Sequence, residues 1–335
     1  MKALVFTGIR EMTYQDVPEP VLNPDDVLIK VHAAGFCGSE LESFVGKSQR
    51  RKPPLIMGHE FSGEIADVGD EVTDLSIGQP VTANPLIPCG ECQYCVRGMT
   101  NACPNRLLHS LQLPGAFADY IAVRREAIFP LTDSLSYHHA AIVEPLANAL
   151  HVNSLVPQHF IENVVVFGAG AIGLVCLQAA IIAGALKTTV VDLSPGRLEL
   201  AKTVGADEVI NARETDVVDR IRKGGGSDLC IDAVGADVTR QSALEIANPG
   251  SYVVYIGIAE TFGEINGHEI IMKELKVLGS YAYTDTDFQK ALAMMERGKI
   301  RVDDWMDIVP LADGHVAINR LIDHPDRWVK VILEP

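Results

Sequence analysis

Four of the seven cysteines in the chain lie within fifteen positions, and their spacing restricts how this segment can fold. Two residues separate Cys89 from Cys92 and Cys92 from Cys95, and seven separate Cys95 from Cys103. Thiolates at this spacing can surround one metal ion from a tight loop, and a closed set of four sulfur ligands is typical of structural zinc. An iron–sulfur cluster, which uses similar Cys-x2-Cys-x2-Cys runs, and a chance grouping of buried thiols are the alternatives. We expect a zinc lobe that does no chemistry itself.

The composition is that of a globular protein with room for two domains. The chain has 335 residues, of which 47% are hydrophobic and 21% are charged. A formal net charge of -16 and a pI near 5.0 argue against nucleic-acid binding, which needs a basic surface. No apolar run has the length of a membrane span, and the first residues carry too little apolar sequence for a signal peptide. An odd number of cysteines, four of them assigned to metal, favours a reducing compartment, so we expect a cytoplasmic protein.

The first 150 residues predict a compact β-rich domain with a second group of metal ligands. Short apolar stretches such as residues 27–33 alternate like half-buried strands and are separated by turn residues. Cys37 is followed twenty-two residues later by His59, with Glu60 next to it. A thiolate, an imidazole and a carboxylate together suit zinc and leave a coordination position open. A small buried cysteine and a core histidine beside a surface acid are the alternatives.

Glu144 is a further candidate ligand in this half of the chain. It follows the apolar residues 140–143 and begins a segment with an apolar helical pattern. A carboxylate among apolar neighbours is stable there only when it is paired or metal-bound. An acid at the N-terminus of a helix, favoured by the helix dipole, is the alternative.

A glycine-rich turn between a buried strand and a helix predicts a dinucleotide site. Residues 164–167 form an unbroken apolar run, typical of a strand buried on both faces, and residues 174–183 have the length and composition of a helix. The Gly-x-Gly-x-x-Gly sequence between them is the fingerprint of a Rossmann unit, in which the backbone approaches a pyrophosphate at the helix N-terminus. The expected binding residues are Gly168, Gly170, Ala171, Ile172 and Gly173.

Asp192 indicates which dinucleotide this turn binds. It ends a second apolar strand over residues 188–192, nineteen residues after Gly173. A carboxylate there can accept hydrogen bonds from the adenosine ribose and repels a 2′-phosphate, so we expect NAD rather than NADP. Arg197 lies close by and is expected to stack on adenine or to clamp a phosphate; a solvated helix residue is the alternative.

Strands and helices continue to alternate after residue 151, which predicts an α/β fold with a doubly wound parallel sheet. Further strands are expected over residues 208–210, 228–235, 250–257 and 277–281, and helices over residues 196–204, 214–223, 237–247 and 269–274. Gly235, Ile256 and Gly257 end two of these strands, where ligands of open α/β sheets bind, so they are candidates for the nicotinamide side of the cofactor. Ordinary turn glycines would look the same.

The end of the chain is expected to return to the β-rich domain. An amphipathic helix begins near residue 287, and a short apolar strand over residues 329–333 has to pair with another strand. The simplest partner lies in the N-terminal region. We therefore expect one domain of residues 1–150 and 287–335, and a dinucleotide-binding domain of residues 151–286.

Together these motifs resemble the zinc-containing medium-chain alcohol dehydrogenases over essentially the whole chain. The resemblance rests on Cys37-Gly-Ser39, Gly58-His59-Glu60, the four clustered cysteines, Glu144-Pro-Leu and the glycine-rich turn. Glutamate instead of cysteine at position 144 is similar to the polyol branch, which includes sorbitol and galactitol-1-phosphate dehydrogenases. The resemblance implies a GroES-like catalytic domain, a Rossmann domain, NAD, one catalytic and one structural zinc ion, and a homodimer or homotetramer.

The resemblance also implies a role for each candidate residue. Cys37, His59 and Glu60 would hold the catalytic zinc, with Glu144 as a fourth ligand or linked to it through water. Ser39 would accept the alcohol proton, so Ser39, Glu60 and Glu144 are the catalytic candidates. The implied reaction is the reversible oxidation of a secondary hydroxyl of a polyol, phosphorylated polyol or cyclitol to a ketone.

Several other activities share these motifs in whole or in part. L-Threonine 3-dehydrogenase and a 2,3-diol dehydrogenase are the near alternatives. A zinc-free quinone-type reductase and a non-catalytic redox sensor that binds a dinucleotide are more distant. Both distant alternatives are disfavoured because the candidate zinc ligands and Ser39 are all present.

The chain departs from many members of this family at three places. Position 40 is Glu where they have Asp, an acid that supports the zinc histidine. Position 42 is Glu where they have a relay histidine, so the proton is expected to leave through Glu42 or through the cofactor ribose and water. Residues 49–52 contain three cations, which we expect to form a solvated loop; attraction of a phosphorylated or acidic substrate is the alternative.

Overall fold

The structure is a computed structural model that describes residues 1–157, 161–326 and 328–335. The chain forms two compact units, one of Met1–Glu144 with Thr284–Pro335 and one of Pro145–Tyr283. The chain thus leaves the first unit, builds the second and returns. The domain limits expected from the sequence lie after residue 150 and before residue 287. Within the described ranges, none of the helices has the length and apolar composition needed to span a membrane.

In the part of the chain that the structure describes, the first unit contains two large β-sheets that share an apolar core and a two-stranded sheet of β7 and β8. The larger sheet has the order β10-β6-β5-β3-β18-β17, with β9 also paired to β3, and the smaller has the order β2-β1-β4. Ile29, Phe61, Ile65 and Ile121 are almost completely buried in this core. The strands from the first part of the chain are β1 (Lys2–Gly8), β2 (Glu11–Asp16), β3 (Asp26–Gly35), β4 (Leu55–Ile56), β5 (Glu60–Val68), β6 (Pro80–Ala83), β7 (Leu86–Ile87), β8 (Leu107–Leu108), β9 (Tyr120–Arg124) and β10 (Ile128–Pro130).

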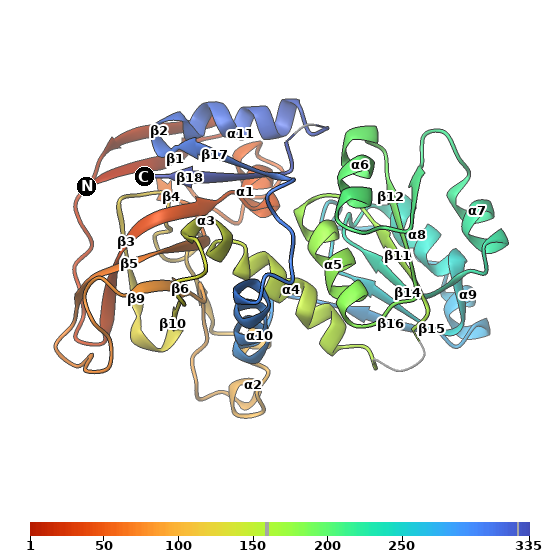
Figure 1. Cartoon of the computed structure of the whole chain (residues 1–335), viewed down its shortest axis with the longest axis horizontal. Coiled ribbons are helices and arrows are strands. Elements are labelled where there is room, and N and C mark those ends of the chain that lie inside the picture. Colours follow the sequence, from red (N-terminus) through yellow and green to blue (C-terminus); the bar gives the residue numbers. More distant parts are fainter. Residues whose placement is uncertain (158–160, 327) are drawn as a thin grey trace. The chain divides into compact units, whose positions relative to one another are not determined.

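The C-terminal segment completes the larger sheet. β17 (Met306–Pro310) runs parallel to β18 (Lys330–Glu334), and β18 pairs antiparallel with β3. Figure 1 shows these blue strands among the red and orange strands of the N-terminal third. The expected terminal strand is therefore β18, and its N-terminal partner is β3. The helices of this unit are α1 (Gly38–Phe44), α2 (Gln93–Val96), α3 (Tyr137–Ala140), α10 (Asp285–Glu296) and α11 (Gly314–Asp323), with 3-10 turns η1 (Thr100–Ala102), η2 (Arg125–Ala127) and η3 (Leu311–Asp313).

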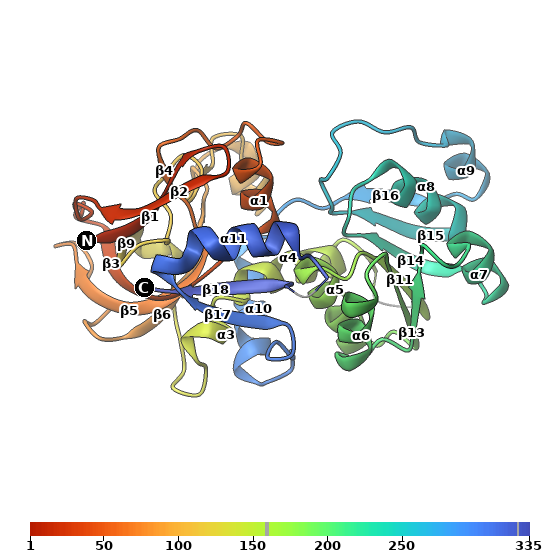
Figure 2. The ribbon, with the colours of Figure 1, turned by 90° about the horizontal axis from the view of Figure 1, so that it is seen from above.

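The second unit is a six-stranded parallel sheet with helices on both faces. Its order is β13-β12-β11-β14-β15-β16, so the direction of winding reverses between β11 and β14. Figure 2 shows α5 and α6 on one side of this sheet and α8 and α9 on the other. The α/β fold class is thereby confirmed. The elements are α4 (Val143–Ser154), which begins at the unit boundary, β11 (Asn163–Phe167), α5 (Ala171–Ile182), β12 (Lys187–Asp192), α6 (Pro195–Thr203), β13 (Glu208–Asn211), α7 (Val217–Lys223), β14 (Ser227–Asp232), α8 (Asp237–Ile246), β15 (Ala247–Tyr255), α9 (Gly267–Met272) and β16 (Lys276–Gly279).

Several element limits differ from the expected ones by two or three residues, and at two of them side chains that bind the backbone give the reason. α7 begins at residue 217 rather than near 214, since the Asp216 side chain accepts a hydrogen bond from the amide of Asp219 and caps the helix. β14 ends at Asp232 rather than at residue 235. Oδ1 of Asp232 accepts hydrogen bonds from the amides of Val234 and Gly235, each at 3.0 Å, and these bonds turn the chain.

Candidate active site

The strand pairing of the first unit brings Cys37, His59 and Glu60 together. β3 ends at Gly35, which pairs with Glu60, the first residue of β5. Cys37 follows β3, and His59 directly precedes β5, so all three candidates lie at the same end of this strand pair. One donor atom from each of the three lies within 4.8 Å of the other two. The two separate sequence motifs therefore form one cluster.

This cluster fits a zinc ion in its chemistry and its burial. His59 and Glu60 are 5% and 1% exposed, and a sulfur, a nitrogen and an oxygen donor together suit zinc. Burial raises the pKa of the Cys37 thiol, but the neighbouring His59 outweighs burial and brings that pKa down to about 7. The thiolate, which is the form that binds metal, is thereby favoured. Burial also raises the pKa of Glu60 well above its usual range, in spite of the Lys330 cation beside it.

Glu40 supports the histidine of the cluster. Nδ1 of His59 lies 2.9 Å from Oε1 of Glu40, and the same oxygen accepts hydrogen bonds from the Gly58 amide at 2.8 Å and the Ser110 hydroxyl at 2.6 Å. Because Nδ1 is used in this way, Nε2 is the nitrogen left for a metal. Burial raises the pKa of the Glu40 carboxyl, but His59 outweighs burial and lowers it to about 2. Glutamate at position 40 is one methylene longer than aspartate, and its carboxylate still lies at hydrogen-bond distance from the histidine.

Lys330 belongs to the cluster, and the sequence did not indicate it. Its Nζ donates hydrogen bonds to Oε2 of Glu60 and, over 2.9 Å, to the carbonyl oxygen of Phe36. Lys330 and Glu60 are each 1% exposed, so this ion pair lies in the interior. Pairing of β18 with the end of β3 brings Lys330 there. The signal available in the sequence is one lysine inside an otherwise apolar terminal strand.

Ser39 lies beside the cluster, and Glu144 is not among its three residues. The Ser39 hydroxyl is 3.4 Å from Sγ of Cys37. Glu144 is partly exposed at the start of α4 and is outside the 4.8 Å group, although its charge adds to the effect of burial on the pKa of Glu60. Glu42 is half-buried on α1, about one turn after Ser39, and burial raises its pKa against the lowering effect of nearby cations.

Arg51 departs from the solvated loop expected for residues 49–52. Arg50 and Lys52 are exposed as expected, but Arg51 is only 5% exposed. Its guanidinium donates hydrogen bonds to the carbonyl oxygens of Ser110 and Ser39. The expectation of a solvated loop is therefore wrong for this residue. Nothing in a run of basic residues distinguishes the buried member from its exposed neighbours.

The four cysteines at 89–103 form a second group. Sγ of Cys92 lies 3.5 Å from that of Cys95 and 3.8 Å from that of Cys103. Sγ of Cys89 lies 3.5 Å from that of Cys103 and 4.0 Å from that of Cys95. Four sulfurs bound at about 2.3 Å to one ion stand roughly 3.8 Å apart in a tetrahedron, so the observed distances fit zinc. All seven cysteines of the chain are free thiols.

The glycine-rich turn joins β11 to α5 in the second unit, as the fingerprint requires. Gly168 has φ of +92°, a left-handed conformation that favours glycine. A Cβ atom at Gly173 would lie 1.7 Å from the carbonyl oxygen of Gly168, so the helix can pack this closely only with glycine there. Gly170 caps α5, and Ala171 and Ile172 form its first turn. A helix N-terminus at such a turn is suited to a pyrophosphate.

Asp192 ends β12 next to this turn and is tied to it. Its Oδ2 accepts a hydrogen bond from the Ala169 amide at 2.7 Å, and its Oδ1 accepts one from the Ser194 amide at 2.8 Å. Arg197 lies in the first turn of α6, where its amide donates to the Ser194 hydroxyl. The acid therefore stands where the fingerprint needs it, at the carboxyl end of the second strand.

Gly235 and Gly257 lie against one another in the turns that follow β14 and β15. A Cβ atom at Gly235, whose φ is +81°, would lie 2.2 Å from the backbone of Gly257. The half-buried Ile256 donates its amide to the Asp232 carbonyl at 3.1 Å and fixes the second turn to the first. Close packing of the two turns thus explains why glycine stands at both positions. Contact of Gly235, Ile256 and Gly257 with a cofactor stays a prediction.

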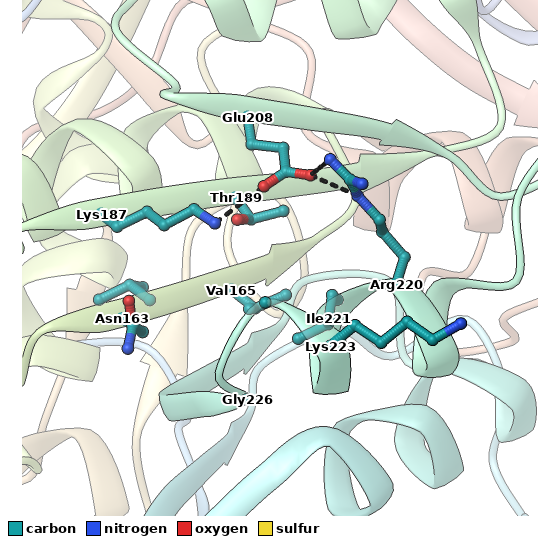
Figure 3. Close-up of a pocket in the computed structure, with 11 residues that line it drawn as sticks. Asn163, Val165, Lys187, Thr189, Glu208, Arg220, Ile221, Lys223 and Gly226 are labelled. Carbon is teal, nitrogen blue, oxygen red and sulfur yellow. Dashed lines mark hydrogen bonds and ion pairs between the residues drawn. The ribbon is translucent and has the colours of Figure 1, made fainter.

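A small cavity of about 170 Å³ lies at the opposite end of the second sheet (Figure 3). It is lined by Asn163 and Lys187, which begin β11 and β12, whereas the glycine-rich turn follows the carboxyl end of β11. Lys187 and Arg220 both pair with Glu208, at 2.9 and 2.8 Å. One carboxylate thus faces two cations, and the cavity does not belong to the site described above.

Comparison with known proteins agrees with both units. Residues 23–133 match the alcohol dehydrogenase GroES-like domain, and residues 171–297 match the zinc-binding dehydrogenase domain. An L-threonine 3-dehydrogenase of Chelativorans sp. (strain BNC1) is 36% identical over 331 residues, which cover 97% of this chain and 91% of that protein. The sorbitol dehydrogenase of Bacillus subtilis (strain 168) is 33% identical over 345 residues, which cover 100% of this chain and 97% of that protein.

A solved structure extends the similarity to the whole fold. A zinc-binding dehydrogenase from Sinorhizobium meliloti 1021, bound to NADP, superposes with a TM-score of 0.92 at 30% identity and covers 100% of this chain and 99% of that one. Two matched domains, two groups of side chains that could hold a metal ion and a dinucleotide fingerprint all lie in one chain. The chain belongs to the zinc-containing medium-chain alcohol dehydrogenase family and is an oxidoreductase.

Proposed function

We propose that the chain is an NAD-dependent dehydrogenase that oxidises a secondary hydroxyl of a polyol-like substrate to a ketone. The observation that carries this proposal is the position of Ser39, whose hydroxyl lies 3.4 Å from the Cys37 thiol in the group with His59 and Glu60. A hydroxyl that can exchange protons thus stands next to three donors that suit zinc. Zinc-assisted alcohol oxidation uses a proton acceptor of this kind next to the metal ligands.

In the proposed reaction each side chain has one task. Cys37, His59 and Glu60 would hold the catalytic zinc, with Glu144 as a fourth ligand or linked through water, and Cys89, Cys92, Cys95 and Cys103 would hold the structural one. Bound zinc supplies a Lewis acid that makes the substrate hydroxyl more acidic. Ser39 would accept the hydroxyl proton and pass its own hydrogen on, and bound NAD would supply the acceptor for the hydride of the carbinol carbon.

The proton then needs a route out of the site. Glu42 lies three residues after Ser39 on α1, a spacing that places two side chains on the same face of a helix. Burial raises the pKa of Glu42, so its carboxylate holds a proton more readily than an exposed one. We propose Glu42 as the acceptor beyond Ser39, with the cofactor ribose and water as the alternative route.

We propose NAD as the cofactor because of Asp192. Its carboxylate ends β12 and binds the Ala169 amide of the glycine-rich turn, so a 2′-phosphate on the adenosine ribose would meet a fixed negative charge. The alternative is a preference for NADP, which the similar S. meliloti protein binds in its solved structure. Initial rates with NAD and with NADP at equal concentration distinguish the two.

The substrate class rests on relatives and on the expected role of Glu144. The sorbitol dehydrogenase of B. subtilis supports a polyol, and phosphorylated polyols and cyclitols fall in the same class of secondary alcohols. The Chelativorans enzyme has the higher identity of the two relatives and favours L-threonine as the second candidate. A 2,3-diol is a third. Threonine carries an ammonium and a carboxylate beside its hydroxyl, whereas a polyol carries neither.

We propose a homodimer or a homotetramer formed through sheet edges. β16 ends the order of the second sheet, and exposed apolar side chains lie on the preceding helix α9, where Ile271 and Met272 are 77% and 69% exposed. An unpaired parallel edge beside apolar surface is a place where a second copy can pair. Light scattering coupled to size-exclusion chromatography gives the number of copies. The seven free thiols support the expected cytoplasmic location.

One experiment tests the function as a whole. Zinc per chain is measured by elemental analysis on the sample that is then screened for NAD reduction with sorbitol, phosphorylated polyols, cyclitols, 2,3-butanediol and L-threonine. Two zinc ions and turnover of a polyol support the proposal. Turnover of threonine or the diol alone would replace the substrate class. One zinc ion and no turnover would favour the non-catalytic alternative.

A further inference from the structure

Arg51 is a cation buried in the interior of the first unit. Its neighbours include Ser39, the proposed proton acceptor. It is 5% exposed, and within the described ranges no carboxylate lies within ion-pair distance of its guanidinium. A buried guanidinium is stable only when its donors are used. The acceptors that bind the Arg51 donors therefore indicate the role of this residue.

Two of the three guanidinium nitrogens reach Ser39. Nη1 donates to the Ser39 carbonyl oxygen at 2.9 Å, and Nη2 donates to the Ser39 hydroxyl at 3.3 Å. Nη1 also lies 3.4 Å from the hydroxyl of Ser43, which in turn donates to the Ser39 carbonyl at 3.1 Å. Arg51 thus holds both the backbone and the side chain of one residue in the first turn of α1.

The third nitrogen connects Arg51 to the histidine support. Nε donates to the Ser110 carbonyl oxygen at 2.6 Å and to the Ser110 hydroxyl at 3.2 Å. Arginine can only donate, so the Ser110 hydroxyl must use its hydrogen elsewhere, and it donates to Oε1 of Glu40 at 2.6 Å. The Arg51 cation is therefore offset by Glu40 through one bridging hydroxyl.

The same rule fixes the hydroxyl of Ser39. Because Arg51 donates to it, one lone pair of the oxygen is occupied; its hydrogen is donated to Sγ of Cys37 at 3.4 Å, and one lone pair remains. A proton relay needs a lone pair to accept the substrate proton and a hydrogen to release, so the hydroxyl would turn its hydrogen away from Cys37 to pass it on.

We propose that Arg51 is a positioning residue for Ser39, holding its hydroxyl toward the Cys37 group with one lone pair free. This inference rests on the proposed function, in which Ser39 accepts the alcohol proton. Arg51 does not touch the substrate in this scheme; it acts through Ser39. Lysine could not replace it, since one ammonium group cannot reach Ser39 and Ser110 with the geometry of a planar fork.

The test compares Arg51→Met and Arg51→Lys with Arg50→Met, which removes the neighbouring exposed arginine. We expect both Arg51 variants to bind two zinc ions and NAD as the wild type does, and to lose kcat by about 10- to 100-fold, the loss typical of a misplaced catalytic group. Arg50→Met should stay within roughly twofold of the wild type. Arg51→Lys retains the positive charge that offsets Glu40, so its folding is the less affected of the two.

Ser39→Ala separates positioning from a general structural role. If Arg51 acts through Ser39, then Arg51→Met should lower kcat by no more than about twofold in the Ser39→Ala background. An equal loss of kcat in both backgrounds would overturn the proposal. Wild-type kcat in Arg51→Lys, together with loss of zinc or of the fold in Arg51→Met, would also overturn it, because the cation alone would then suffice.

A readout that does not depend on turnover completes the test. In crystal structures of the zinc-loaded wild type and Arg51→Lys, we expect the Ser39 side-chain torsion to differ, and an unchanged torsion would refute the positioning role. If the wild type oxidises no alcohol, the proposed function fails, but the Ser39 torsion still decides whether Arg51 holds this side chain.

Discussion

Glu40 binds the histidine of one metal-binding segment and the backbone of the other. Its Oε1 lies 2.9 Å from Nδ1 of His59, and its Oε2 accepts a hydrogen bond from the Cys37 amide at 3.1 Å. The carboxylate is completely buried and ties together two segments that approach one another only because β3 pairs with β5. The separation of the candidate ligands therefore depends on a residue that need not touch the metal.

The first prediction concerns Glu40→Gln, which retains the shape but removes the charge. We expect the affinity of the Cys37 group for zinc to fall by about 10- to 100-fold. A neutral amide accepts the Nδ1 proton of His59 more weakly than a carboxylate does, and its NH2 group cannot accept the hydrogen bonds that one of the two carboxylate oxygens now receives. Competition with a chromogenic chelator measures the affinity. Glu71→Gln, at an exposed position, is the matched control and should bind zinc as the wild type does. Equal affinity in both variants would contradict the role of Glu40.

The second prediction concerns the buried ion pair of Lys330 and Glu60. Lys330→Met leaves a buried carboxylate without its cation, and removal of one partner of such a pair typically costs about 3–5 kcal/mol of folding free energy. The added variant Glu60→Gln should recover part of that loss. Urea unfolding of metal-free protein measures the change, with the exposed Lys299→Met as the control. A double variant no more stable than Lys330→Met would show that the two side chains are not coupled.

The expected metal ligands can be recognised from short stretches of sequence, whereas Lys330 can be recognised only from contacts between distant parts of the chain. Cys37, His59 and Glu60 stand in local motifs, so their types and spacing indicated a metal site before any pairing was known. Lys330 meets Glu60 across 270 positions of sequence, and only the pairing of β18 with β3 reveals it. A lysine in an apolar strand is ambiguous until the opposite charge is located.

The glycines also show what the sequence can and cannot predict. The fingerprint identified Gly168 and Gly173 because strand, turn and helix are consecutive in the chain. Gly235 and Gly257 were expected to approach the cofactor, but each is also required by the backbone next to it, since a Cβ atom on either would lie 2.2 Å from the opposite turn. The need for glycine at a position does not by itself distinguish a ligand from a neighbouring turn.

The third prediction concerns the cysteine lobe. Cys92→Ser opens a closed set of four sulfur donors, so we expect zinc to fall from two ions to one per chain and the melting temperature to decrease. Elemental analysis and differential scanning calorimetry measure the two effects. Cys176→Ala, in α5 of the other unit, removes a cysteine without touching the lobe and should leave the zinc content unchanged. Full zinc content and an unaltered melting temperature in Cys92→Ser would exclude Cys92 as a ligand of a structural metal.

The last prediction concerns the choice between NAD and NADP. Asp192→Asn removes the negative charge beside the adenosine ribose, so the ratio of kcat/KM for NAD over NADP should fall by about tenfold or more, the effect of about 1.4 kcal/mol. Some loss with NAD itself is also expected, because Asp192 accepts amide hydrogen bonds with both oxygens and asparagine can replace only one of them. Glu199→Gln is the control: it also removes one negative charge, but from an exposed position on α6. It tests whether loss of a negative charge at another position changes the ratio of kcat/KM for NAD over NADP. If the two variants have equal ratios, long-range charge rather than a contact at the ribose sets the preference, and Asp192 loses its assigned role.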